Sequence, residues 1–244
     1  MPSVPDAHDF GFGEIMTYEV PGLLTLSAYC LVQPPLRLVP ELGQLHQTVL
    51  AALALVVGYF LGHMIQAFTT YIRKLLRWTC GAPVPRLLVG EPQGKVLFMR
   101  GWGTSYSDGY RRAVLASLES YWELPRATTP LGQYYALCEA LLEHECPSIW
   151  TIHHRFTRTA NLLRGVAVPA VLLGIALAPR MHQAPVLFTA FALIMLRRSV
   201  SFEINSARLV FDGFYSIAVD RQKRGGGNAK IDECALATAA TVDA

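Results

Sequence analysis

An uninterrupted apolar run constrains the fold of this chain more than any other feature. Residues Thr48 to Phe68 contain no aspartate, glutamate, lysine or arginine over 21 positions. As an α-helix this run is about 30 Å long, which matches the hydrocarbon core of a bilayer. Basic and aromatic residues follow it, namely Arg73, Lys74, Arg77 and Trp78. The run therefore predicts a membrane-spanning helix.

The composition agrees with a membrane protein. The 244 residues are 52% hydrophobic and 16% charged, whereas a soluble domain carries about 25% charged residues. The first twenty residues contain no lysine or arginine, so no cleavable signal peptide is expected. The five cysteines are odd in number and scattered, which argues against a disulfide framework.

Three further apolar runs are shorter than the first one described. They cover residues 20–32, 162–178 and 184–196. The last two are separated by a short turn with two prolines, which favours a helical hairpin. Together with the run at 48–68, they predict four spans in two hairpins.

The basic residues are distributed very unevenly around these spans. Twelve lie between residues 69 and 164, and seven follow the fourth span, leaving only Arg37 and Arg180 in the other two loops. Lysine and arginine accumulate on the cytoplasmic side of membrane proteins. The bias predicts a protein of the cell (inner) membrane with both termini and the central segment in the cytoplasm.

We therefore expect an all-α membrane protein with a small, mostly helical cytoplasmic insertion and a cytoplasmic C-terminal helix. Helix starts are predicted at Ser107 or Asp108, at Thr129 and at Pro147, and the last helix has no break before the third span. A turn at 91–94 between the apolar stretches 87–89 and 96–99 favours a short β-hairpin. The expected segments are an N-terminal segment (1–15), a first transmembrane hairpin (16–68), the insertion (69–160), a second hairpin (161–197), an amphipathic helix (198–224) and a disordered tail (225–244).

The densest group of potential metal ligands consists of Cys138, His144, Cys146 and His153. Zinc is held by three or four such side chains, usually in closely spaced pairs. The spacings here match no standard zinc motif, so the interpretation we favour is a buried cysteine and histidines at the headgroup boundary. No cofactor is expected.

Three other groups of residues are candidate sites. Glu203, Arg208 and Asp212 interrupt an apolar helical pattern, either as a solvated stripe, which we favour, or as a charge network at an interface or aqueous path. Gly58 and Gly62 form a small-x3-small pattern that permits close helix packing, within or between chains. The last group places aromatic residues beside arginines and would contact an anionic ligand or lipid headgroups, or complete the fold: Trp102, Tyr106, Arg111 and Arg112.

The sequence contains no recognised catalytic motif, and three functional classes remain open. The first is a non-enzymatic membrane module that self-associates, as a pore-forming effector or a scaffold, while its cytoplasmic region receives a signal or partner. The second is a constitutive small channel or transporter. The third, which we favour least, is a membrane-bound enzyme that uses the Cys138, His144, Cys146 and His153 group. The expected partners are the lipid bilayer, further copies of the chain and a cytoplasmic protein or signal, and no nucleic acid is expected.

Overall fold

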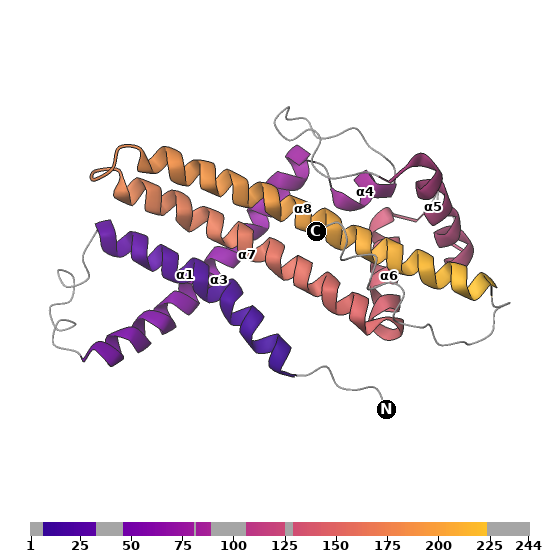
Figure 1. Ribbon diagram of the computed structural model, residues 1–244, viewed down its shortest axis with the longest axis horizontal. Helices are drawn as coiled ribbons and strands as arrows, with labels where there is room; N and C mark the ends of the chain where they lie inside the picture. The colour runs from indigo at the N-terminus through magenta and orange to yellow at the C-terminus, as the bar shows by residue number, and fades with distance from the viewer. Residues whose placement is uncertain (1–6, 33–45, 81, 89–105, 125–128, 224–244) are drawn as a thin grey trace. The chain divides into compact units, whose positions relative to one another are not determined.

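The computed structural model describes residues 7–32, 46–80, 82–88, 106–124 and 129–223. Within these ranges all regular secondary structure is helical (Figure 1). Four helices are long and apolar enough to cross a membrane, which supports a multi-pass membrane protein. The helices are α1 (Ala7–Val32), α3 (Gln47–Cys80), α4 (Pro83–Leu88), α5 (Asp108–Trp122), α6 (Leu131–Glu145), α7 (Pro147–Leu177) and α8 (Ala184–Lys223).

The chain divides into two compact units. Unit 1 comprises residues 1–75 and 158–200, and unit 2 comprises residues 76–157 and 201–244. The division falls inside α3, α7 and α8, so each of these three helices contributes residues to both units.

In unit 1, α1 and α3 cross at glycines (Figure 1). A Cβ atom on Gly22 would lie 1.7 Å from the carbonyl oxygen of Gly58, and one on Gly62 would lie 1.7 Å from that of Tyr18. Only glycine permits this backbone approach. The ring of Tyr18 stacks on that of His63, with ring centroids 4.0 Å apart. The Gly58 and Gly62 pattern is therefore used for helix packing within the chain.

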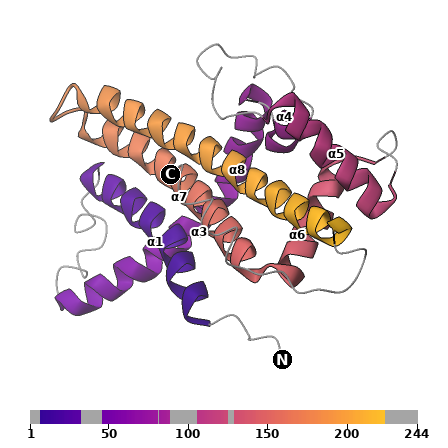
Figure 2. The same cartoon turned by 45° about the vertical axis from the view of Figure 1, so that its right-hand side comes forward.

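The other helices of unit 1 form the predicted hairpin. Figures 1 and 2 both show α7 and α8 side by side there, joined by a turn over residues 178–183. Ala167 and Ala170 of α7 pack against Ala192 of α8, flanked by Phe188. Small residues let the two helices approach closely, as is common for helices packed in lipid.

Unit 2 has a core of large side chains. On α8, Phe211 and Phe214 are fully buried, and Phe214 contacts the ring of Tyr121 edge to face at a centroid distance of 5.4 Å. A Cβ atom on Gly213 would meet Leu142 of α6 and Ile149 of α7, so these helices lie close to α8. Further large buried residues of this core come from α4, α5, α6 and α8: Leu87, Leu88, Val114, Leu115, Leu118, Tyr134, Val210 and Ile217.

The local predictions are mostly confirmed. The Oγ of Ser107 caps α5 by accepting a hydrogen bond from the N–H of Tyr110, and α7 runs unbroken from Pro147 into the third span. Pro130, and not Thr129, occupies the N-cap position of α6. The predicted helix at 198–224 is not separate, because it continues the fourth span as one helix of 40 residues.

The predicted β-hairpin is wrong at its first strand, since Leu87 and Leu88 belong to helix α4 and are buried in the core of unit 2. Two apolar residues in a row are compatible with a strand or a helix, and packing against α5 and α6 decides between them. Residues 89–99 and the tail at 225–244 lie outside the described residues.

Candidate functional site

The four predicted metal ligands do not converge. Among the described residues, no three histidine, cysteine or acidic side chains lie close enough to hold a metal ion. Cys138 and Cys146 are buried, whereas His144 is exposed. Burial, together with the nearby charge of Glu139, raises the pKa of the Cys138 thiol and so disfavours the thiolate that a metal requires. This group is therefore part of the helical packing of unit 2.

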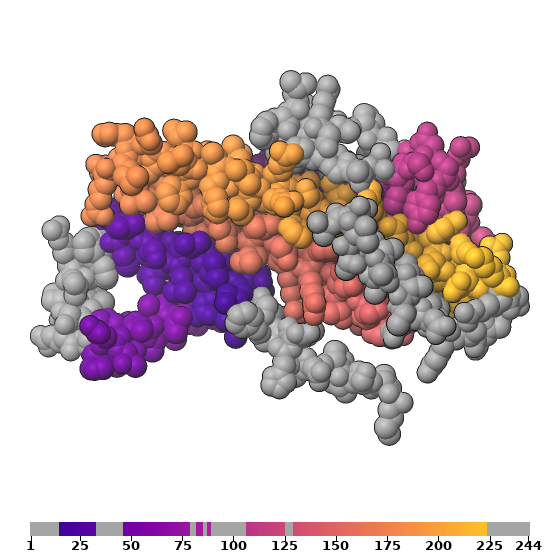
Figure 3. All heavy atoms as spheres, in the orientation of Figure 1, coloured from indigo at the N-terminus to yellow at the C-terminus, as the bar shows by residue number. Residues whose placement is uncertain are grey.

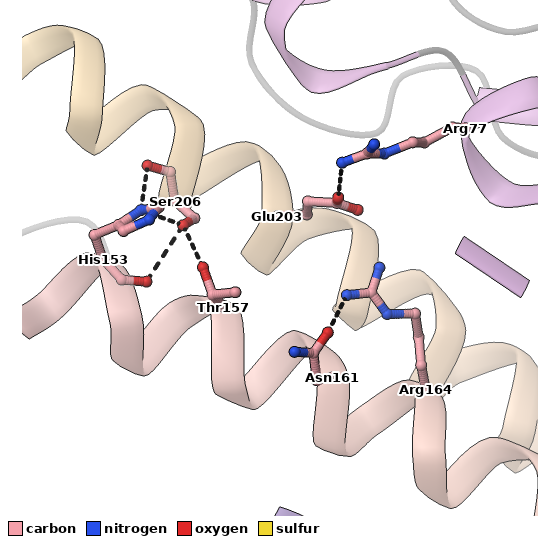
Figure 4. Close-up of polar contacts among 7 residues, drawn as sticks. All are labelled: Arg77, His153, Thr157, Asn161, Arg164, Glu203 and Ser206. Carbon is pink, nitrogen blue, oxygen red and sulfur yellow. Dashed lines mark hydrogen bonds and ion pairs between the residues drawn. The ribbon is translucent and has the colours of Figure 1, made fainter. Parts of the chain in front are cut away.

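His153 instead belongs to a buried hydrogen-bonded relay that joins α6, α7 and α8 within unit 2. Its Nε2 lies 3.0 Å from Oε1 of Glu139. Its Nδ1 lies 2.7 Å from Oγ of Ser206 (Figure 4). A carboxylate can only accept, so Nε2 donates to Glu139, and Nδ1 shares a hydrogen bond with the Ser206 hydroxyl. The Ser206 hydroxyl also lies 3.0 Å from that of Thr157. Of the two histidines expected at the headgroup boundary, His153 is buried within unit 2.

The order serine, histidine, glutamate resembles a nucleophilic relay, but its setting does not suit catalysis. Ser206 is 3% exposed, and its Oγ is surrounded by His153 and Thr157. A substrate carbonyl would have to reach this oxygen between two packed helices, where the backbone N–H groups already bond within the helix. The relay is suited to holding α7 and α8 in register, because its partners fit in only one alignment of the two helices.

At a second polar site of unit 2, Asp212 accepts hydrogen bonds from two tyrosine hydroxyls. Its Oδ1 lies 2.7 Å from the hydroxyl of Tyr106 and 2.9 Å from that of Tyr110. Burial and then the negative charge of Asp212 raise the pKa of both tyrosines, so the phenols stay protonated and act as donors. The guanidinium of Arg208 lies over the Tyr106 ring, 5.5 Å from its centroid.

Glu203 has a different partner. Its Oε1 lies 2.7 Å from Nη2 of Arg77 on α3, and its side chain is only 12% exposed (Figure 4). Glu203 and Asp212 are thus bound to other helices of unit 2, and the favoured interpretation of a solvated stripe is wrong for them. Charged residues on a solvated face and charged residues that bind other helices have the same spacing along one helix. The sequence could therefore not distinguish the two arrangements.

Of the aromatic residues and arginines that were predicted to form one group, the described members lie at different places in the structure. Tyr106 is buried against α8, whereas Arg111 and Arg112 bond to Asp108 within the first turn of α5. Trp102 lies outside the described residues. Tyr106 therefore belongs to the core of unit 2, and Arg111 and Arg112 make contacts within α5.

Unit 1 contains a polar junction that the sequence did not identify as a site. Pro21 has no N–H, so the carbonyl of Thr17 lacks its usual helical donor. The side-chain amide of Gln66 on α3 supplies a donor, with Nε2 lying 3.0 Å from this oxygen and 3.4 Å from the carbonyl oxygen of Asn161 on α7. One amide group carries two N–H bonds, so Gln66 can link α1, α3 and α7.

Arg164 lies one turn beyond Asn161 on α7 and is almost completely buried in unit 1. Its Nη2 donates to Oδ1 of Asn161 over 2.7 Å (Figure 4). A buried arginine among apolar helices is costly unless its donors are bonded. The sequence placed this residue at the end of a span, where an arginine commonly extends towards water. Its burial depends on neighbouring helices, which no local pattern reports.

Comparisons with models of known protein families, with curated proteins and with solved structures find no match.

Proposed function

We propose that this chain is a non-enzymatic, multi-pass protein of the cell (inner) membrane that couples a helical cytoplasmic region to its membrane-spanning helices. One observation carries the proposal. Helices α7 and α8 are continuous over 31 and 40 residues, and each contributes to unit 1, with its exposed apolar surface, and to unit 2, with its large apolar core. A continuous helix transmits a displacement along its axis because each turn is bonded to the next.

In this proposal, unit 2 receives a signal or a cytoplasmic partner and unit 1 responds in the bilayer. The response is a change in self-association or in membrane permeability, and a scaffold that only anchors its partner is the simpler form. Gly58 and Gly62 are occupied by α1, so self-association would use another face of unit 1. The basic residues of 69–160 and of the C-terminal part support a cytoplasmic position for both.

The coupling is tested by asking whether the two units unfold together. All four tryptophans (Trp78, Trp102, Trp122 and Trp150) belong to unit 2, so their fluorescence reports this unit, while far-ultraviolet circular dichroism reports the helices of both. Coupled units give coincident transitions by both probes, and Ser206→Ala shifts both to the same extent.

Ser120→Ala is the matched control, because it makes the same change at an exposed position of α5 in unit 2. If Ser206→Ala shifts the tryptophan transition and leaves a separate helical transition unchanged, the units are independent and the coupling proposal fails.

The topology is tested with single-cysteine variants in a cysteine-free background and a membrane-impermeant thiol reagent on intact cells. We expect labelling of His182→Cys, in the turn between α7 and α8, and protection of Thr129→Cys until the membrane is permeabilised. The reverse pattern would place unit 2 outside the cell and would remove the cytoplasmic partner from the proposal.

A constitutive channel is the second candidate. The half-buried Gln66 and Asn161 and the buried Arg164 of unit 1 favour it, since polar groups within membrane helices often mark ion pathways. Ion and dye release from liposomes that contain the folded protein distinguishes a constitutive channel from the coupled module. Continuous release supports the channel, whereas tight liposomes with correctly inserted protein exclude it and leave the coupled module.

A further inference from the structure

Helix α3 is too long for the hydrocarbon core that its apolar part spans. Its 34 residues extend over about 51 Å, about 20 Å more than the hydrocarbon thickness. The apolar run ends at Phe68, yet exposed large side chains continue along the helix in unit 1. Tyr71 is 67% exposed and Leu75 is 58% exposed. This part of α3 therefore has a surface suited neither to bulk water nor to hydrocarbon alone.

The charges on this part of the helix all have one sign. Arg73 and Lys74 lie between the two exposed residues, and the sequence contains no acidic residue between Glu41 and Glu91. The ammonium group of Lys74 lies over the ring of Tyr71, 5.7 Å from its centroid. The stem of Lys74 thus runs beside an aromatic ring, and its charge lies at the end of an apolar surface.

We propose that this segment of α3, defined by Tyr71, Arg73, Lys74 and Leu75, binds the headgroups of anionic phospholipids. Tyrosine favours the boundary between hydrocarbon and water, where its ring contacts acyl chains and its hydroxyl reaches the polar layer. The two cations then lie at the level of the lipid phosphates, with Leu75 beside them in the headgroup layer. The attraction of basic residues to an anionic leaflet provides the selectivity over zwitterionic lipid.

The proposal rests on the membrane insertion of α3 in the proposed function, but not on coupling between the units. It is tested with the full-length protein in phosphatidylcholine vesicles that contain spin-labelled phosphatidylglycerol or spin-labelled phosphatidylcholine. Electron paramagnetic resonance measures the fraction of each lipid that the protein immobilises. We expect the wild type to immobilise phosphatidylglycerol preferentially, and the preference to fall as ionic strength rises.

The double variant Arg73→Gln and Lys74→Gln should lose this preference, by up to about fivefold for each charge removed at low salt. Arg73→Lys with Lys74→Arg should keep it. The double variant Arg111→Gln and Arg112→Gln removes the same charge from unit 2 and should also keep it. Circular dichroism of each variant establishes that it is folded.

Four results would overturn the proposal, and the last of them would also overturn the proposed function. The first is an unchanged preference in the glutamine variant of Arg73 and Lys74. The second is displacement of the spin-labelled lipid by soluble glycerol phosphate, which would indicate a site for a free phosphate compound. The third is equal immobilisation of both lipids by the wild type, which leaves membrane insertion intact. If neither lipid is immobilised, the protein is not inserted, and the proposed function fails together with this inference.

Discussion

The two units are built on opposite principles. In unit 1 the interior contains small and polar residues, and large apolar side chains are exposed on its helices, which are drawn in colours from indigo to orange in Figure 3. In unit 2 the interior contains phenylalanine, leucine and isoleucine, and Trp78 is the one exposed large apolar residue among its described positions. The buried residues of unit 1 include Thr17, Gly22, Gly62, Ala167, Ala170, Arg164 and Ser199.

This difference follows from the surroundings that each unit suits. Water drives large apolar side chains into a core, because their exposure is unfavourable. Lipid provides no such drive, so helices within it associate through close backbone approach and through polar contacts. The described residues of 76–157 and 201–223 therefore form a helical unit with a water-type core, although α3, α7 and α8 each continue from it into a candidate membrane span.

The largest effect on stability is expected from a substitution in the core of unit 2. Phe214→Ala removes a fully buried ring and should lower the free energy of unfolding by about 3–5 kcal/mol. Phe60→Ala in unit 1 removes a ring that is 65% exposed and should cost less than about 1 kcal/mol in lipid. Denaturant unfolding in lipid nanodiscs measures both. A comparable loss for Phe60→Ala would mean that its face of α3 is covered by protein.

A smaller effect is expected at the glycine crossing of unit 1. Gly62→Ala places a Cβ atom against the carbonyl of Tyr18 and should cost about 1–3 kcal/mol through separation of α1 and α3. Gly132→Ala has free space and should stabilise α6 by about 0.5–1 kcal/mol. Thermal unfolding in one detergent compares the two. Equal stability of both variants would contradict the close crossing.

The polar junction gives a third comparison. Gln66→Leu leaves the Thr17 carbonyl without its side-chain donor and should cost about 1–2 kcal/mol. Gln133→Leu, on the exposed face of α6, makes the same chemical change at the surface of unit 2 and should cost close to nothing. Unfolding with increasing sodium dodecyl sulfate measures the difference. A neutral Gln66→Leu would show that the carbonyl finds another donor.

The smallest effect concerns the two tyrosines on Asp212. Tyr106→Phe removes one donor and should cost about 1 kcal/mol at neutral pH. Burial and the charge of Asp212 hold the pKa of Tyr106 above its ordinary value of about 10, so this tyrosine ionises more readily in the unfolded chain. The contribution of Tyr106 to the free energy of unfolding is therefore present below pH 10 and is lost as the pH rises further.

The alkaline branch of the stability curve sharpens this prediction. Tyr106→Phe should flatten the decline above pH 10 by about 1.4 kcal/mol per pH unit, measured by denaturant unfolding at several pH values. An identical slope for the Tyr106 variant would show that this phenol ionises as readily in the folded protein as in the unfolded chain.

Local sequence patterns predicted most of the helices because their causes are local. The apolar run at 48–68, the cap at Ser107 and the unbroken pattern after Pro147 each act within a few turns. The candidate sites were predicted less well. Cys138 and His153 are near in sequence, but His153 bonds to Ser206, which lies 53 residues away and carries no local signal.

The glycines show the limit of sequence reasoning within one motif. The spacing of Gly58 and Gly62 determined that α3 presents a smooth face, because glycine has no side chain wherever it lies. Only the tertiary structure decided that α1 of the same chain covers this face.

The same division holds for the whole chain. The sequence by itself determined the four long apolar helices and the absence of acidic residues from α3. It also determined the excess of basic residues between the second and third apolar runs and after the fourth. These features follow from composition and helical period, which are properties of short stretches. The tertiary structure decided which polar groups are buried and which partners they have. Gln66 bonds to the carbonyl exposed by Pro21, and Asp212 accepts two tyrosines, because packing brings together residues that the chain keeps far apart.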